Sequence, residues 1–272
     1  ALDVASNDGY PEAKDLWLGF DGLEWLLVRA GQFKVPTSRQ RLVSGTRMLF
    51  VERPGLADFV RARELGAAVK VHTPLEHYSA EVGAFNGMGE NTTREDAEGF
   101  PLLSFRVEAM PLAVLEGGEG DVARSPEPAL ALGAHVAYTQ DALADDEEPS
   151  LTRIDGARLQ YGGDIAFKWA GFYFGGEFVG AWYRPDAGAE WFGAGWLLQS
   201  SYYVAPIRCE AAVRYDELNP SDQLEDDRER TLSFGLNAYP FESQSFKLQA
   251  SYALAFEGRD DDLTFLVQLA YP

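Results

Sequence analysis

Seven basic side chains are gathered in residues 31–66 of a chain that is otherwise strongly acidic. This stretch also holds three acids, which gives it a net charge of +4; the whole chain of 272 residues has a formal charge of −20, so the remainder carries −24. The seven are Lys34, Arg39, Arg41, Arg47, Arg53, Arg61 and Arg63. Concentrated positive charge raises the local concentration of anions, so we predict an anion-attracting element here. The alternative is a surface loop whose arginines pair with neighbouring acids.

The other residues whose side chains could act in catalysis or bind a metal are too scattered to form such a site. His72, His77 and His135 lack the spacing of metal ligands, and Cys209 is the single cysteine. His77 and Ser79 share a strand face, but no orienting partner or oxyanion hole is evident beside them. We therefore predict that the protein is not an enzyme.

Three runs of acids offer the oxygen ligands that hard cations prefer. They are residues 145–148 (DDEE), 225–227 (EDD) and 260–262 (DDD). None has the spacing of an EF-hand loop. We expect no cofactor; Ca²⁺ or Mg²⁺ bound at these acidic loops and bridging to lipopolysaccharide is the alternative to simple solvation.

Composition argues against two further classes of protein. The acidic balance argues against a nucleic-acid partner, because a phosphate backbone needs a broad basic face. No apolar run reaches the roughly 18 residues that a membrane-spanning helix needs. The aromatic content of 12 Tyr, 17 Phe and 6 Trp, together with 27 Gly, favours strands joined by turns.

Alternation of apolar and polar residues is the main structural pattern. Ile165, Phe167 and Trp169, for example, share one face of a predicted strand, and Asp164 and Lys168 share the other. Fourteen segments of this kind are predicted: about 1–7, 14–20, 24–33, 64–73, 75–85, 101–113, 129–140, 157–169, 171–184, 190–204, 206–217, 230–239, 246–256 and 262–271. A soluble sandwich would also alternate, so the pattern alone leaves both architectures open.

The connections between segments distinguish the two architectures. Every second connection is tight, with residues 114–128 as the single long exception, and the intervening connections are longer and strongly acidic. An outer-membrane barrel has short periplasmic turns, long external loops and an even number of strands, and its closed sheet pairs every backbone group in hydrocarbon. We predict a transmembrane antiparallel up-and-down β-barrel that forms a single domain over residues 1–272.

Aromatic residues near segment ends suit the girdles of such a barrel. They are Tyr138, Trp169, Trp182, Tyr183, Trp191, Tyr202, Tyr203, Tyr215, Tyr239 and Tyr271. The cations opposite the apolar face are then expected to line the lumen: Arg29, Lys70, Arg106, Lys168, Arg208, Arg214 and Lys247. Six acids share that face, namely Glu64, Glu81, Glu108, Asp164, Glu177 and Glu210, so the predicted lumen is mixed in charge.

The basic stretch becomes an external connection of about 30 residues, far longer than an ordinary hairpin loop. Its interior contains many apolar residues, including Leu49, Phe50 and Phe59, which predicts that it folds against a wall. In a barrel the available wall is the lumen, where an inserted loop narrows the passage. We therefore predict a lumen-folded constriction loop over residues 34–63.

At these residues the chain resembles the phosphate-selective porin O and P family. The resemblance rests on "GQFKVPTS" from Gly31, "VERP" from Val51, "RELG" from Arg63 and "FNG" from Phe85, with "RYDELNP" from Arg214 further on. It implies an outer-membrane barrel of about sixteen strands, commonly trimeric, that passes small anions. The constriction role then falls on Lys34 and the arginines of the long loop.

The chain departs from the family in its mixed lumen and in its start inside a strand, so one or two N-terminal strands are expected to be missing. We predict a barrel of 14–16 strands in a bacterial outer membrane, in contact with lipid and lipopolysaccharide and forming a homotrimer. It would pass small hydrophilic solutes or ions, with a preference for anions or phosphate. The alternatives are a plugged barrel that anchors a surface assembly, and a soluble acidic β-sandwich or ligand-binding barrel.

Overall fold

The computed structural model describes residues 2–7, 10–87, 89–91, 101–142, 154–224, 227–241, 246–257 and 262–269. These residues form one antiparallel sheet of fourteen strands whose spatial order is the order of the sequence. The strands are β1 (Leu2–Asn7), β2 (Tyr10–Leu23), β3 (Leu26–Lys34), β4 (Arg63–His72), β5 (Tyr78–Phe85), β6 (Leu102–Ala109), β7 (Ala129–Ala142), β8 (Ile154–Trp169), β9 (Phe172–Pro185), β10 (Trp191–Val204), β11 (Cys209–Asn219), β12 (Glu229–Ala238), β13 (Phe246–Glu257) and β14 (Asp262–Leu269). The predicted strand order and up-and-down topology are confirmed.

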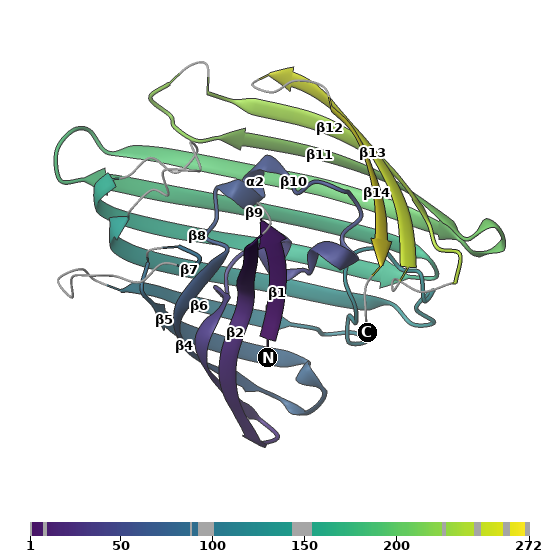
Figure 1. Cartoon of the computed structure of the whole chain (residues 1–272), viewed down its shortest axis with the longest axis horizontal. Coiled ribbons are helices and arrows are strands. Elements are labelled where there is room, and N and C mark those ends of the chain that lie inside the picture. Colours follow the sequence, from purple (N-terminus) through teal and green to yellow (C-terminus); the bar gives the residue numbers. More distant parts are fainter. Residues whose placement is uncertain are drawn as a thin grey trace.

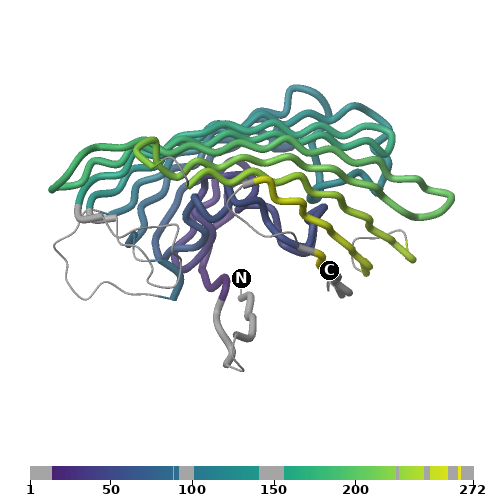
Figure 2. The backbone as a smooth tube through the Cα atoms, turned by 90° about the horizontal axis from the view of Figure 1, so that it is seen from above, coloured from purple at the N-terminus to yellow at the C-terminus, as the bar shows by residue number. Residues whose placement is uncertain are grey.

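The sheet bends into a curved wall (Figure 1), and the loop between β3 and β4 lies on its concave side (Figure 2). Five short helical turns interrupt the connections: α1 (Arg39–Leu42), η1 (Gly45–Arg47), α2 (Gly55–Asp58), η2 (Pro74–Glu76) and η3 (Ala205–Ile207). Within the described residues the sheet is open, because β1 and β14 are its two edges. The described strands therefore form an open sheet, and pairing of β1 with β14, which would close the predicted barrel, is not observed among them.

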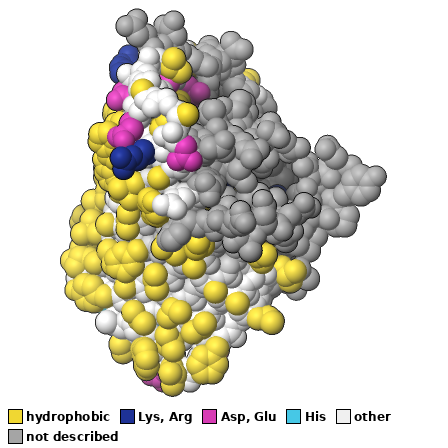
Figure 3. Space-filling view, turned by 90° about the vertical axis from the view of Figure 1, so that its left-hand side faces the viewer, with side chains coloured by type: hydrophobic (Ala, Val, Ile, Leu, Met, Phe, Trp, Pro, Cys, Tyr) yellow, Lys and Arg dark blue, Asp and Glu magenta, His cyan; other side chains and the backbone are white. Residues whose placement is uncertain are grey.

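The convex face carries the apolar side chains. Phe178 and Trp182 on β9 are 42% and 50% exposed, and the described surface in Figure 3 is largely hydrophobic. The concave face is polar, with Arg106, Asp164 and Glu177 all buried there. This inversion of the usual burial pattern is what hydrocarbon outside and a polar lumen inside require.

The predicted aromatic girdle is partly wrong. Trp169, Trp182 and Tyr202 are half exposed on the convex face, as a girdle requires, but Tyr183, Tyr203 and Tyr239 are buried. Tyr183 and Tyr203 occupy inward positions of β9 and β10, each next to an exposed residue, so strand alternation directs them away from the lipid side.

The tight turns lie at one end of the sheet, where their backbone geometry reverses the chain within a few residues. Between β8 and β9, Ala170 and Gly171 both have positive φ, of 52° and 95°, as a two-residue hairpin turn requires. The connection between β6 and β7, residues 110–128, is at the same end but is long. Among the described residues, no helix has the length and apolarity needed to cross a membrane.

A charge placed at the middle of the convex face should destabilise the fold more than one placed near a strand end. Phe178→Arg lies mid-strand and should lower the free energy of unfolding by about 2–4 kcal/mol, whereas Trp182→Arg, nearer the interface, should cost about 0–1 kcal/mol. Urea unfolding of the protein folded into lipid vesicles measures both. Equal losses would contradict a hydrocarbon environment for this face.

Candidate functional site

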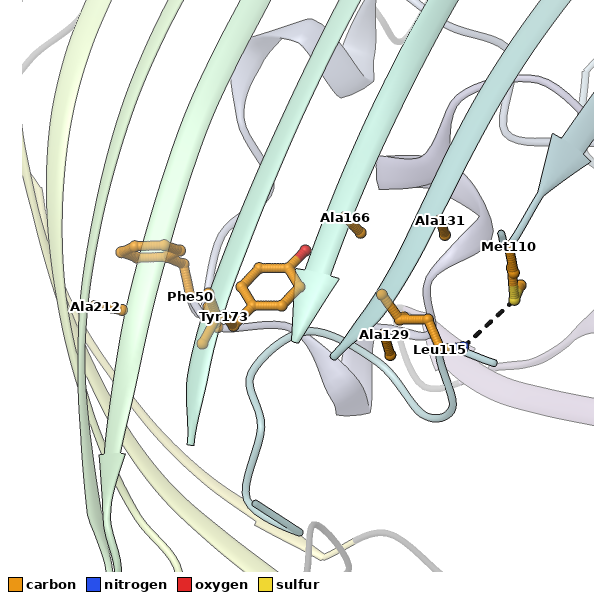
Figure 4. Close-up of a cluster of buried hydrophobic side chains, with 9 residues drawn as sticks. Phe50, Met110, Leu115, Ala129, Ala131, Ala166, Tyr173 and Ala212 are labelled. Atoms are coloured by element: carbon orange, nitrogen blue, oxygen red, sulfur yellow. Dashed lines mark hydrogen bonds between the residues drawn. The ribbon is translucent and has the colours of Figure 1, made fainter. Parts of the chain in front are cut away.

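The loop of residues 35–62 is held against the concave wall by its apolar side chains. Leu49 and Phe50 pack with the wall residues Ala166, Tyr173 and Ala212 in one buried cluster (Figure 4). Small wall residues let the loop approach the strands closely. The predicted lumen-folded loop is therefore confirmed.

Two further clusters hold the ends of the loop. Leu56, Phe59 and Val60 pack on Val179 and Leu197, which belong to β9 and β10. At the start of the loop, Val35 joins a cluster that contains Phe33 from β3 and Phe85 from β5. The separate clusters fix the loop along its whole length rather than at one point.

Cations of the wall donate hydrogen bonds to carbonyl oxygens of the loop. Arg106 donates to Thr37 O at 2.6 Å, Arg158 to Phe59 O at 2.5 Å, Arg214 to Glu52 O at 3.1 Å and Lys247 to Met48 O at 2.6 Å. These bonds satisfy loop carbonyls that would otherwise be unpaired after burial. Much of the basic charge of the wall therefore serves to hold the loop.

The loop itself starts with a capped helical turn that presents Arg39 to the wall. Ser38 is the N-cap of α1 and accepts a hydrogen bond from Arg41 N at 3.3 Å. Arg39 pairs with Asp164 on β8 and Glu108 on β6, both at 2.7 Å. Arg106 pairs with the same two carboxylates, at 2.6 Å and 3.0 Å. Two cations and two acids thus form a neutral cluster.

The two acids of this cluster stabilise the protonated, positively charged form of Arg39. Burial lowers the pKa of the Arg39 guanidinium, but the attraction of Asp164 and Glu108 outweighs burial, so the net shift is upward. Its neighbour Gln40 donates its backbone N–H to Glu177 at 2.9 Å. The first turn of the loop is therefore attached to three acids of the wall.

The remaining predicted loop cations, except Arg47, brace the loop or its ends. Lys34 donates hydrogen bonds to the carbonyls of Leu42 and Val43, and Arg53 donates to those of Gln40 and Val43. The pKa of Arg53 is lowered, first by burial and then by the nearby charge of Arg41. The others have carboxylate partners: Arg41 with Asp58 at 3.3 Å, Arg61 with Glu64 at 3.8 Å and Arg63 with Asp15 at 3.0 Å. These contacts place the cations at the loop and leave their predicted role in anion binding untested.

Arg47 differs from the other six. Its side chain is exposed at the end of η1, and among the described residues no carboxylate pairs with it. Its carbonyl accepts a hydrogen bond from Glu119 N at 2.8 Å, and a Cβ on Gly118 would lie only 2.2 Å from the Arg47 Cβ. Glycine at 118 permits this close contact, which holds Arg47 in place while leaving its guanidinium free.

The predicted lumen cations mostly lie on the concave side. Arg29 pairs with Glu81, and Lys70 pairs with Glu76 at 2.7 Å; the hydrogen bond from Lys70 lowers the pKa of Glu76. Arg106, Lys168, Arg214 and Lys247 are buried at inward strand positions. Arg208 instead lies after the turn η3, exposed, and donates to Pro240 O at 2.9 Å.

Glu119 is a site residue that sequence reasoning missed. It belongs to residues 110–128, which enter the concave side from the end opposite the loop, and it is 2% exposed. Its carboxylate accepts hydrogen bonds from Gln40 Nε2 at 2.6 Å, Leu49 N at 2.9 Å and Gln199 Nε2 at 2.5 Å. Residues 110–128 therefore form a second insert on the concave side, and Glu119 joins this insert to the loop and to the wall. The unusual length of this connection was the available signal.

Most of the predicted metal loops lie outside the described residues: all of 145–148, and residues 225, 226, 260 and 261. Within the part of the chain that the structure describes, no group of three or more His, Cys, Asp or Glu side chains is placed to hold a metal ion.

Comparison with known proteins identifies relatives of this fold. The family model described as phosphate-selective porin O and P matches residues 1–113. A loop-deletion mutant of OmpT, an outer-membrane protein of Vibrio cholerae, has a TM-score of 0.63 at 13% identity, covering 97% of this chain and 81% of that one. The trimer form of OmpT gives 0.58 at 13% identity, over 95% and 78%. No curated protein matches the chain by sequence.

An anion-selective porin from Comamonas acidovorans is also similar, with a TM-score of 0.54 at 13% identity, covering 90% of this chain and 70% of that one. At such identities the structural matches show the fold. The resemblance to the porin family is confirmed over residues 1–113, and so is the outer-membrane β-barrel fold class. The predicted location in a bacterial outer membrane is confirmed with them.

Removing the charge of Glu119 should loosen both inserts. Glu119→Gln replaces one accepting oxygen by an NH₂ group facing donors, which should cost about 1–3 kcal/mol of stability because buried donors lose their acceptor. We expect noisier and larger single-channel currents in planar bilayers and a lower Tm. Glu127→Gln, exposed in the same segment, is the control. Identical currents and Tm for both variants would contradict the role of Glu119.

Proposed function

We propose that this chain is a porin that passes small hydrophilic solutes or ions passively, with residues 35–62 as the constriction and a preference for anions. The family match and the porin fold support the channel. A similar structure is described as an anion-selective porin, which is compatible with anion preference here.

The observation that carries the anion preference is the exposed, unpaired guanidinium of Arg47. The cluster of Arg39, Arg106, Asp164 and Glu108 is neutral as a whole, so it contributes little net field at a distance. Arg41, Arg61 and Arg63 are likewise compensated by carboxylates. An uncompensated charge at a narrow passage sets which ions enter. Arg47 is therefore the cation that a permeating solute meets.

We further propose that the protein works as a homotrimer surrounded by lipid and lipopolysaccharide, and that it has no enzymatic role. The trimer form of OmpT supports the oligomer. The exposed apolar residues of the convex face, such as Phe178 and Leu198, suit contact with lipid. Phosphate is one anion that such a pore would pass, and the charge of Arg47 alone does not distinguish it from other small anions.

A second candidate function is a plugged barrel that anchors a surface assembly. The observation in its favour is the junction of two inserts that enter from opposite ends and meet at Glu119. The two functions differ in a single measurement: well-folded protein that gives no unitary current in planar bilayers would favour the anchor.

Reversing the charge at position 47 should change ion selectivity. For Arg47→Glu we expect the zero-current potential in a salt gradient to move toward cation preference. Arg184→Glu, a change of equal charge at a side chain on β9 that is 78% exposed, is the control. Selectivity that is unaltered by Arg47→Glu in a conducting protein would remove the assignment of anion preference to Arg47.

A further inference from the structure

A pocket of about 500 Å³ lies between the second insert, residues 110–128, and the end of strand β8. It is partly open to solvent, and its volume is within the range of sites that hold small organic molecules. Most of its lining comes from the insert, including the apolar side chains of Val114 and Val122, whereas Lys168 comes from the wall. No residue of loop 35–62 lines this pocket, so it is distinct from the constriction.

The second insert is fixed to the wall by hydrogen bonds, so the pocket is preformed. The carboxylate of Asp121 accepts from Ser125 N at 3.0 Å, from Ser125 Oγ at 2.8 Å and from Gly171 N at 2.7 Å. Ser125 O in turn accepts from Ala170 N at 3.0 Å. Leu115, from the same insert, packs in the buried cluster of Figure 4. The oxygens of Asp121 are thereby engaged in holding the insert on the turn between β8 and β9.

Lys168 brings a buried positive charge to this pocket. It is 4% exposed, and its ammonium group donates to Glu116 O at 2.8 Å. Among the described residues this is its only hydrogen bond, and no carboxylate pairs with it. An ammonium group has three N–H donors, so two of them remain for a ligand. A buried cation with a single neutral acceptor is stabilised by an anionic group placed against it.

Glu116 brings an opposite charge to the same pocket. It is exposed, and within the part of the chain that the structure describes its carboxylate makes no hydrogen bond or ion pair. Three acids line the pocket in all. A simple anion would be repelled by these acids, and a simple cation would be repelled by Lys168. A solute that carries both charges is attracted at both ends.

We propose that this pocket binds a small zwitterionic solute with apolar side chains, of the class of a dipeptide, with its carboxylate on Lys168 and its ammonium on Glu116. The side chains of the solute then contact Val114 and Val122. The proposal names a solute class for the channel proposed above and rests on that function. The pocket would serve as a binding station at the end of the passage opposite the entry of loop 35–62.

Calorimetric titration of the folded protein in detergent with the dipeptide alanyl-leucine tests the site. We expect saturable binding of one dipeptide per chain. The N-acetyl dipeptide, which lacks the ammonium, and the dipeptide amide, which lacks the carboxylate, should each bind about tenfold more weakly, because each loses a hydrogen bond between charged groups. No saturable binding, or equal affinities for the three compounds, would overturn the proposal.

The titration needs no ion current, so it separates this site from the proposed channel. A protein that conducts ions but does not bind the dipeptide would overturn the site alone. A protein that binds the dipeptide but gives no current would keep the site and contradict the channel.

Variants separate the two charges of the pocket. Lys168→Met should weaken binding of the dipeptide about tenfold, and Glu116→Gln should weaken binding of the dipeptide but not of its N-acetyl form. The control is Glu190→Gln, at an acid that is 58% exposed and precedes β10 at the opposite end of the sheet. If Lys168→Met does not fold, Glu116→Gln at an exposed residue tests the site by itself. Equal affinity of the dipeptide for Glu116→Gln and Glu190→Gln would overturn the proposal.

Discussion

The structure depends on the requirement that strands in hydrocarbon turn their apolar side chains outward and pair their backbone groups with one another. Phe178, Trp182 and Leu198 lie on the convex face for this reason, and charged residues occupy the concave face. Each inward charge is then partly removed from water and must find a partner inside. The lumen is consequently organised as a network of ion pairs and hydrogen bonds rather than as a row of free cations.

That requirement explains how a basic loop can be built into an acidic protein. Arg39 enters the wall because Asp164 and Glu108 are there, and these acids also neutralise Arg106. Arg214 and Lys247 donate to loop carbonyls, which have no strand partner. Positive charge in the loop and on the wall therefore serves first to fix the loop against the wall. The positive charge that a solute could meet is that of the side chains that make no such structural contact.

Strand positions, topology and the inward fold of the loop could be predicted from sequence because each has a local signal. Alternation around Ile165 and Phe167 marks β8, and the apolar content of residues 48–60 indicates a packed loop. Alternation also placed Tyr183 opposite Trp182, and the girdle assignment for Tyr183 was wrong because it relied on the position along the strand and ignored the face. Alternation failed at Arg208, because the turn η3 ends at this residue and β11 begins only at Cys209, so Arg208 is not part of a strand.

The pairing of the loop cations could not be predicted, because it depends on which distant strands come together. Arg39 and Arg47 are the same residue type within one loop, yet one contacts β6 and β8 and the other has no carboxylate partner among the described residues. Glu119 is one acid among 43 acidic residues, and the unusual length of its connection marks the segment but not this residue within it.

Two inserts that enter from opposite ends and meet at Glu119 hold loop 35–62 in place more strongly than either insert could alone. Loop 35–62 cannot move away from the wall without breaking its bonds to Glu119 at Gln40 and Leu49, and the second insert cannot withdraw without losing the contact of Gly118 with Arg47. The position of Arg47 is therefore determined by both inserts together. An arginine carried by a single hairpin loop would move with that loop, whereas Arg47 is held between two chain segments anchored at different strands.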